Sequence, residues 1–360
     1  MKDFIKEILI EDYGNDYETI FNNSDLLKYL DLKTSAIFGN SKTRKSLANI
    51  YSIYAILYFY SKSYYNKPDE YKKFEGYEFT TLLSFCRSQY GGEKIQNHAL
   101  NSRLNGEFEN KILSDNNKGK QLVIINNGKY AIHIDYIYVN GIDTSKSVLK
   151  IIEKYIELLR AKDDKLITDL ENLTNEIDID TIRTKIIEFI NEKSEARIFE
   201  IISYAILKHH YKGIEVFIGY SLDSIKKEFL TLYKTGRTNA NDGGIDFVMK
   251  PIGRFFQVTE VDNYDKYLLD MDKVMHFPLT FVIKTDYNKE IIMNQISDFI
   301  NQKSGGMQII KNRYESAIEE IITTNELKQW FMQLDNQAVN DILFDIILFY
   351  KIEMNLYDIE

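Results

Sequence analysis

Residues 241–261 constrain the fold of this 360-residue chain more tightly than any other segment. They read Asn-Asp-Gly-Gly-Ile-Asp-Phe-Val-Met-Lys-Pro-Ile-Gly-Arg-Phe-Phe-Gln-Val-Thr-Glu-Val. The two glycines favour a turn, and the apolar run that begins with Asp246 favours a strand. Pro251 and Gly253 then predict a hairpin that leads into a second strand. The segment therefore predicts two paired strands inside an α/β domain.

The second of these strands carries a polar face. Successive side chains of a strand point to opposite faces, so Gln257 and Thr259 share one face and their neighbours share the other. Pairing of the strands would bring the carboxylate of Asp246 to this polar face. A buried carboxylate without a partner is costly, so Asp246 in an apolar strand indicates a site. Oxygen donors of this kind suit Mg²⁺.

The segment resembles the core of the PD-(D/E)XK nucleases, in the Mrr-like form whose second motif is Gln-x-Lys. The resemblance covers about residues 195–285 and rests on Asp-Gly-Gly-Ile-Asp at 242–246, a hairpin, Gln-Val-Thr at 257–259, and an upstream helix that begins with Phe199-Glu200 and ends at Tyr211. It implies that Asp246 binds the metal and that Gln257 fills the (D/E) position. Glu200 would reach in from the helix to assist the metal or a water molecule.

Thr259 departs from the family pattern, because the family usually has lysine at this position. The positive charge of that lysine is expected to stabilise the phosphorane or to orient the attacking water, and threonine has no charge. Three alternatives are open: Lys250, Arg254 or Lys266 supplies the cation from nearby, Glu260 turns inward through a bulge and gives a more acidic site, or the chain has lost its activity. The resemblance thus implies the catalytic residues Asp246, Gln257, Thr259 and Glu200, with Mg²⁺ bound by Asp246 and Gln257.

The N-terminal part of the sequence predicts a winged helix-turn-helix. Helices are predicted at residues 46–60, 79–89 and 94–104, followed by strands at 122–125 and 130–134. Asn-Asn-Gly-Lys at 126–129 joins the strands as a hairpin. The polar segment 94–105 would be the recognition helix, since its Gln, Asn and Arg side chains can pair with base edges in the major groove. A polar surface helix is the open alternative.

Basic and amide side chains of this part are the candidate DNA contacts. The wing would touch a phosphate, and the start of the first helix would position the domain on the DNA backbone. The candidates are Lys94, Gln96, Asn97, Asn101 and Arg103 in the recognition helix, Lys129 in the wing, and Lys42, Arg44 and Lys45 at the helix start.

The chain as a whole is predicted to be mixed α/β (α+β). Residues 1–143 would form the DNA-recognition domain, 144–180 a helical linker, and 181–360 the nuclease domain, with a central mixed sheet flanked by helices. Within the last domain we expect helices at 181–192, 195–211, 289–302, 308–323 and 326–350, and strands near 244–249, 254–261 and 279–283.

Charge and cysteine content narrow the function classes. The net charge of −9 argues against a protein that simply coats nucleic acid. Residues 33–73 nevertheless carry eight basic and two acidic side chains, whereas 314–360 carry two basic and ten acidic ones. A single cysteine, Cys86, excludes an internal disulfide framework and favours a reducing cytoplasm. The sequence predicts neither a signal peptide nor a membrane span.

These features together predict a type II-like restriction endonuclease that hydrolyses double-stranded DNA with Mg²⁺. Two cuts on a symmetric target imply a homodimer. A cognate DNA methyltransferase would act on the same site without needing to bind the chain. The alternatives are a modification-dependent nuclease of the Mrr type and a non-catalytic DNA-binding regulator with a decayed nuclease fold.

Overall fold

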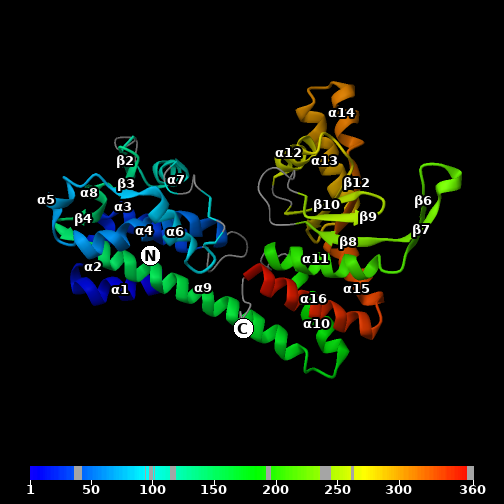
Figure 1. Cartoon of the computed structure of the whole chain (residues 1–360), viewed down its shortest axis with the longest axis horizontal. Helices are drawn as coiled ribbons and strands as arrows, with labels where there is room; N and C mark the ends of the chain where they lie inside the picture. Colours follow the sequence, from blue (N-terminus) through cyan, green and yellow to red (C-terminus); the bar gives the residue numbers. More distant parts are fainter. Residues whose placement is uncertain are drawn as a thin grey trace. The chain divides into compact units, whose positions relative to one another are not determined.

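The computed structural model describes residues 1–35, 43–93, 95–96, 100, 102–113, 119–191, 196–235, 245–260 and 263–354. It divides into two compact units, Met1–Leu166 and Ile167–Glu360 (Figure 1). Helices and strands are mixed along the chain, which confirms the predicted α+β class. The segment predicted as a linker contains α9, Ser145–Leu173, a continuous helix across the boundary between the units. Within the described residues, no helix is long and apolar enough to cross a membrane.

Unit 1 begins with the helices α1 (Asp3–Tyr13), α2 (Tyr17–Asn23), α3 (Asp25–Thr34) and α4 (Thr43–Ser63). Ser24 caps α3, because its hydroxyl accepts a hydrogen bond from the Leu27 backbone N–H at 3.2 Å. The middle of α4 is apolar and buried on most sides, which places this helix in the core of the unit.

The helix and hairpin order predicted for the N-terminal part is present. After α4 come α5 (Pro68–Tyr71), β1 (Tyr77–Glu78), α6 (Phe79–Arg87), α7 (Ser102–Ile112), β2 (Val123–Asn126) and β3 (Lys129–Ile132), with strand order β1-β3-β2. Asn127 and Gly128 both have positive φ angles, as the tight hairpin turn requires. The unit continues with α8 (Ile134–Ile137) and the short strands β4 (Tyr138–Val139) and β5 (Ile142–Asp143) before α9.

The predicted boundaries of the recognition helix were wrong. The helix in this place is α7, which begins at Ser102, whereas Gln96 lies outside any α-helix. The buried side chains of α7 are Leu104 and Phe108, four residues apart. The apolar stripe that packs the helix therefore begins where the predicted helix was ending.

Unit 2 is built around a mixed sheet. Its helices are α10 (Ile179–Ile190), α11 (Ala196–His210), α12 (Tyr264–Lys273), α13 (Lys289–Lys303), α14 (Gln308–Glu315), α15 (Thr324–Gln333) and α16 (Asn336–Met354). Its strands are β6 (Glu215–Ile218), β7 (Lys226–Phe229), β8 (Thr231–Lys234), β9 (Phe247–Lys250), β10 (Arg254–Glu260), β11 (Leu279–Lys284) and β12 (Ile318–Thr323). Within the described residues, the main sheet has the order β12-β11-β10-β9-β8.

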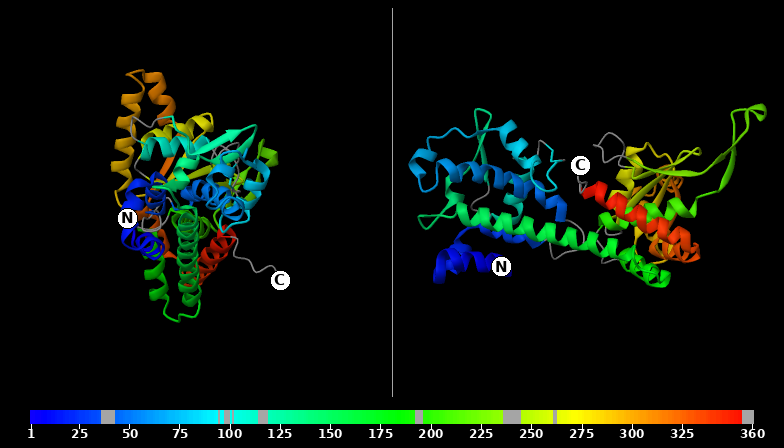
Figure 2. Two further views of the ribbon diagram at one scale, coloured as in Figure 1. Left: turned by 90° about the vertical axis from the view of Figure 1, so that its left-hand side faces the viewer. Right: turned by 60° about the horizontal axis from the view of Figure 1, so that its bottom comes forward.

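The main sheet changes direction at β10, and helices cover both of its faces. Strands β8, β9 and β10 are antiparallel neighbours, whereas β10, β11 and β12 are parallel. Helices α12 and α13 pack their apolar side chains against Leu279, Phe281 and Ile283 of β11. Helices α11 and α16 lie on the other side of the sheet in Figures 1 and 2. The predicted central mixed sheet flanked by helices is therefore present.

Two of the predicted elements near the C-terminus were wrong. Residues 308–323 form α14 and then β12, because Ile321 and Ile322 pair with β11 in the buried part of the sheet. The helix predicted at 326–350 is interrupted at Asp335, whose carboxylate accepts a hydrogen bond from the Ala338 N–H at the start of α16. Strands β6, β7 and β8 were not predicted.

We expect Cys86 to be inert in the folded protein. Its thiol is fully buried and lies 3.2 Å from the carbonyl oxygen of Tyr51, and burial raises the pKa of the thiol to about 12. A disulfide reagent at pH 8 should therefore label the native chain at least ~100-fold more slowly than the chain in denaturant. Stoichiometric labelling of the native chain within minutes would show that the thiol is accessible.

Candidate active site

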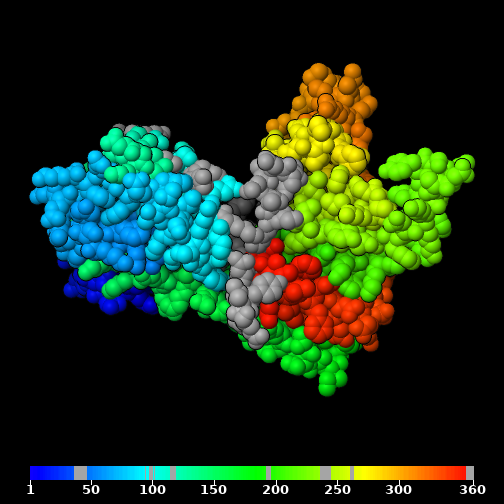
Figure 3. Space-filling view, in the orientation of Figure 1, coloured from blue at the N-terminus to red at the C-terminus, as the bar shows by residue number. Residues whose placement is uncertain are grey.

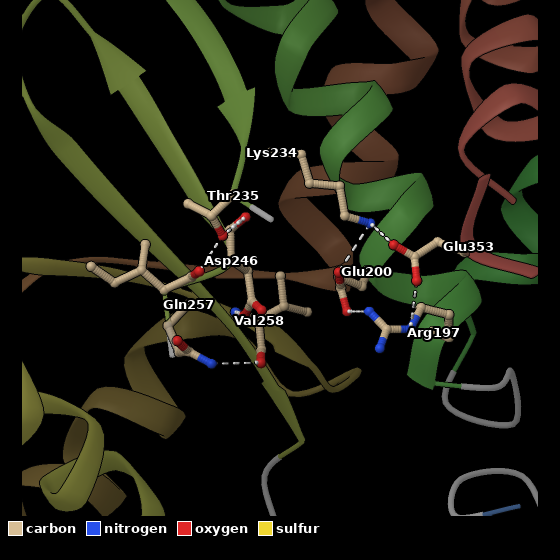
Figure 4. Close-up of polar contacts among 9 residues, drawn as sticks. Arg197, Glu200, Lys234, Thr235, Asp246, Gln257, Val258 and Glu353 are labelled. Carbon is tan, nitrogen blue, oxygen red and sulfur yellow. Dashed lines mark hydrogen bonds and ion pairs between the residues drawn. The ribbon is translucent and has the colours of Figure 1, made fainter. Parts of the chain in front are cut away.

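Asp246 is held at the start of β9 by hydrogen bonds on both sides. Its backbone N–H donates to the Phe256 carbonyl at 3.0 Å, and its carbonyl accepts from the Thr235 N–H at 2.9 Å. The carboxylate Oδ2 accepts a hydrogen bond from the backbone N–H of Val258 at 2.7 Å (Figure 4). Residues of β8, β9 and β10 thus fix the position of a single acidic side chain at one end of the sheet.

Gln257 and Thr259 are the polar side chains on either side of Val258, the residue that binds this carboxylate. Both side chains are buried, with exposed fractions of 7% and 4%. The Gln257 Nε2 donates to the Val258 carbonyl at 3.4 Å, so the amide and the Asp246 carboxylate contact the two polar backbone groups of one residue. The N–H and C=O of a strand residue point to the same side, so the two side chains lie at the same edge of β10.

Lys266 brings a cation to Thr259. It lies on α12, which begins directly after β10, and its Nζ donates to the Thr259 hydroxyl at 3.2 Å. Its charge also acts on the Asp246 carboxylate and lowers the pKa of that group. Lys266 therefore contacts Thr259 directly and acts on Asp246 through its charge.

The other candidates for the missing cation lie elsewhere or are not described. Arg254 is at the opposite end of β10, where it pairs with Glu319 and Glu320. The Nζ of Lys250 lies 5.0 Å from the centre of the Tyr233 ring, at the far end of β9. The side chain of Glu260 lies outside the described part of the chain.

The surroundings of Asp246 favour its neutral form. Burial, followed by the negative charge of Glu200, raises the pKa of Asp246 to about 7. The hydrogen bond from Val258 and the charges of Lys266 and Arg197 act in the opposite direction and do not cancel the rise. A bound cation would relieve this unfavourable environment of the ionised carboxylate.

Glu200 lies in a cluster of ion pairs next to the site. Its carboxylate contacts Arg197 at 2.7 Å and Lys234 at 3.0 Å through different oxygens (Figure 4). Glu353 of α16 contacts the same two cations, each at 3.5 Å. Glu200 also acts on the Asp246 carboxylate through its negative charge. The resemblance had implied a direct contact with metal or water.

Sequence reasoning missed three members of this cluster. Arg197 precedes Glu200 by three residues on one helix, a spacing that signals a local ion pair. Lys234 and Glu353 come from β8 and α16, and no local pattern connects them to Glu200. The fold brings these residues together, so only the tertiary structure could identify the cluster.

The donors of the site fit Mg²⁺ in kind. A carboxylate oxygen, a side-chain amide oxygen and a hydroxyl are hard ligands, and Mg²⁺ is commonly held by one or two carboxylates together with water. Within the described residues, no group of three His, Cys, Asp or Glu side chains is arranged to hold a metal ion. If an ion binds here, the carboxylate of Asp246 and the amide oxygen of Gln257 are the groups that would hold it.

The predicted DNA contacts are described only in part. Gln96 and Arg103 are exposed, and Arg103 lies in the first turn of α7. Lys129 at the start of β3 pairs with Glu75 at 2.9 Å and with Glu78 at 3.9 Å, so its charge is partly neutralised. Lys42, Lys94, Asn97 and Asn101 lie outside the described residues, as do the side chains of Arg44 and Lys45.

Comparisons of the chain with protein-family models, with curated proteins and with solved structures gave no match.

Proposed function

We propose that the chain is a type II-like restriction endonuclease that hydrolyses phosphodiester bonds of double-stranded DNA with Mg²⁺. The observation that carries the proposal is the position of Lys266. Its ammonium group contacts the hydroxyl of Thr259, and its positive charge acts on the carboxylate of Asp246, which is bound by the neighbouring residue Val258. The site thus combines an acidic side chain and a cation, as the resemblance to the PD-(D/E)XK core requires, although the cation comes from another position.

Each side chain has a role in this proposal. Asp246 and Gln257 would hold the metal ion, which when bound supplies a Lewis acid and lowers the pKa of a water molecule. Lys266, positioned by Thr259, would stabilise the negative charge that develops on the phosphate oxygens. Glu200, held between Arg197 and Lys234, would keep the affinity of Asp246 for a cation high through its charge.

Unit 1 would recognise the DNA. The exposed Arg103 on α7 would reach base edges, and the β2–β3 hairpin would lie along the backbone. Two copies would act together on a symmetric site. The proposal includes a cognate methyltransferase that protects the same site and a cytoplasmic location, where the enzyme would meet DNA and Cys86 would stay reduced.

Digestion of plasmid DNA tests this function. Unmethylated and methylated plasmids are incubated with the chain in Mg²⁺ or in EDTA, and the ends of the products are sequenced. We expect cutting of unmethylated DNA at fixed positions, in Mg²⁺ only. Cutting of methylated DNA alone would indicate the Mrr-type alternative, and binding without cutting would indicate the non-catalytic regulator.

Replacement of Lys266 by methionine should lower the rate of plasmid cleavage by about 10²-fold, the usual effect of removing one group that stabilises a transition-state charge. Lys266→Arg should keep part of the activity. The control is Lys303→Met on α13, where Lys303 forms an exposed ion pair with Asp265 of α12 at 2.7 Å. If Lys266→Met cleaved plasmid DNA at the wild-type rate and Lys250→Met did not, Lys250 and not Lys266 would be the residue that stabilises the transition-state charge.

A further inference from the structure

The hairpin of β6 and β7 is a projecting arm, here defined as residues 214–229. The two strands pair with each other in a sheet separate from the main one. In Figures 1 and 3 the hairpin stands clear of the rest of unit 2. Side chains that a folded domain would normally bury are exposed along it: Ile214, Phe217, Ile218, Tyr220, Leu222, Ile225 and Phe229.

The tip of the arm is an ordered structure. A Cβ atom on Gly219 would lie 2.7 Å from the backbone N of Ile225 on the opposite side of the hairpin turn. Only glycine therefore fits at this position. Ser221 and Ser224 form a reciprocal capping box around the short turn Leu222–Ser224. This turn holds Tyr220 and Leu222 almost completely in solvent. A two-stranded hairpin with such a surface is marginally stable in water unless another surface covers it.

The area and charge of the arm identify the kind of surface that fits it. A fully exposed large side chain presents roughly 150–250 Å², so the exposed apolar side chains of the two faces and the tip together offer on the order of 800 Å². A partner that wraps both faces and the tip would therefore bury about what one side contributes to a specific protein–protein interface. Glu215, Asp223 and Glu228 balance Lys226 and Lys227, so the arm has no excess of positive charge to attract phosphate groups.

We propose that the arm docks against the arm of a second copy of this chain. Two arms that lie antiparallel about a two-fold axis bury the same area on each copy. The tip of each arm then reaches the base of its partner. At that base is a hollow of about 500 Å³, lined by Phe229, Leu232 and Phe344 together with polar side chains. Tyr220 of the partner copy would enter it.

Sedimentation velocity tests this interface without DNA or metal, so the outcome is independent of nuclease activity. At tens of micromolar, the wild type should be a dimer, and the double variant Tyr220→Ser/Leu222→Ser should be a monomer, with the dimer dissociation constant raised at least ~100-fold. The control is the substitution Ile177→Ser. Ile177 is an apolar residue outside the arm that is 94% exposed, and its replacement should not change the dimer dissociation constant. Equal far-ultraviolet circular dichroism spectra would show that the variants are folded.

A cross-link tests the antiparallel arrangement. Phe217 lies midway along the arm, so Phe217→Cys should form a disulfide between copies on oxidation, because the native Cys86 is buried. Glu188→Cys on the exposed side of α10 should not. A monomeric wild type, a dimer that survives the arm substitutions, or a wild-type monomer that sediments with phosphatidylcholine vesicles would each overturn the proposal.

Discussion

The variant Asp246→Asn should lose Mg²⁺-dependent cleavage of plasmid DNA by about 10³-fold or more, while its affinity for DNA stays within about threefold of wild type. A metal ion contributes several kcal/mol to transition-state stabilisation, and each 1.4 kcal/mol corresponds to a factor of ten in rate. Asparagine can still accept the hydrogen bond from the Val258 N–H, so the local fold should survive. Only the charge that holds the ion is removed.

Cleavage rate and DNA binding are measured separately to test this result. Binding is followed by fluorescence anisotropy of labelled DNA in EDTA, and cleavage by single-turnover digestion in Mg²⁺. The control is Asp298→Asn, which removes an exposed carboxylate from α13 of the same unit and should change neither quantity. Cleavage by Asp246→Asn at a rate close to that of wild type would place the site elsewhere.

The same substitution should stabilise the fold at neutral and higher pH. Burial and Glu200 raise the pKa of Asp246 to about 7, well above the value of an unfolded aspartate. The folded chain therefore holds a proton that the unfolded chain has lost between about pH 4 and pH 7, and the free energy of unfolding falls as pH rises through this window. An asparagine side chain at this position would carry no such penalty. The gain should be on the order of 4 kcal/mol at pH 8, since each pKa unit corresponds to about 1.4 kcal/mol, and should vanish near pH 4.

Urea denaturation at a series of pH values in EDTA measures this difference, and Asp286→Asn gives a control of opposite sign. Burial acts to raise the pKa of Asp286, but hydrogen bonds from Thr324 and Lys328 outweigh it and leave the pKa lowered. Replacing Asp286 should therefore destabilise the chain at pH 7 and have little effect at low pH. A lower free energy of unfolding for Asp246→Asn than for wild type at pH 8 would mean that the ionised carboxylate stabilises the folded state.

The turn between β2 and β3 and the strands β9 to β11 could be predicted from short sequence patterns. Asn127-Gly128 sets the turn between β2 and β3 through positive φ angles. The strands β9, β10 and β11 follow from alternating or continuous apolar runs, and Gln257 and Thr259, two residues apart in the strand β10, lie on one face of it as predicted. These features depend on neighbours within about ten residues.

Long-range contacts explain the rest. β12 has a helix-compatible sequence, and its pairing with β11 decides its structure. The cluster of Glu200, Arg197, Lys234 and Glu353 joins three elements that share no local signal. Lys266 was one of several basic residues close in sequence, and only the start of α12 places it at Thr259. The arm was not predicted. Its two strands pair only with each other and carry apolar side chains although they are exposed, so they lack the alternation of buried and exposed residues that marks a strand of a packed sheet.

The most direct measurement of the central claim is the anomalous diffraction signal of Mn²⁺ in a crystal of the chain grown with Mn²⁺ in place of Mg²⁺. The proposed site predicts a peak within coordination distance of an Asp246 carboxylate oxygen and on the Gln257 side of β10, and predicts that Asp246→Asn removes it. A peak held by other residues, or no peak at Asp246 at saturating Mn²⁺ with DNA bound, would contradict the claim.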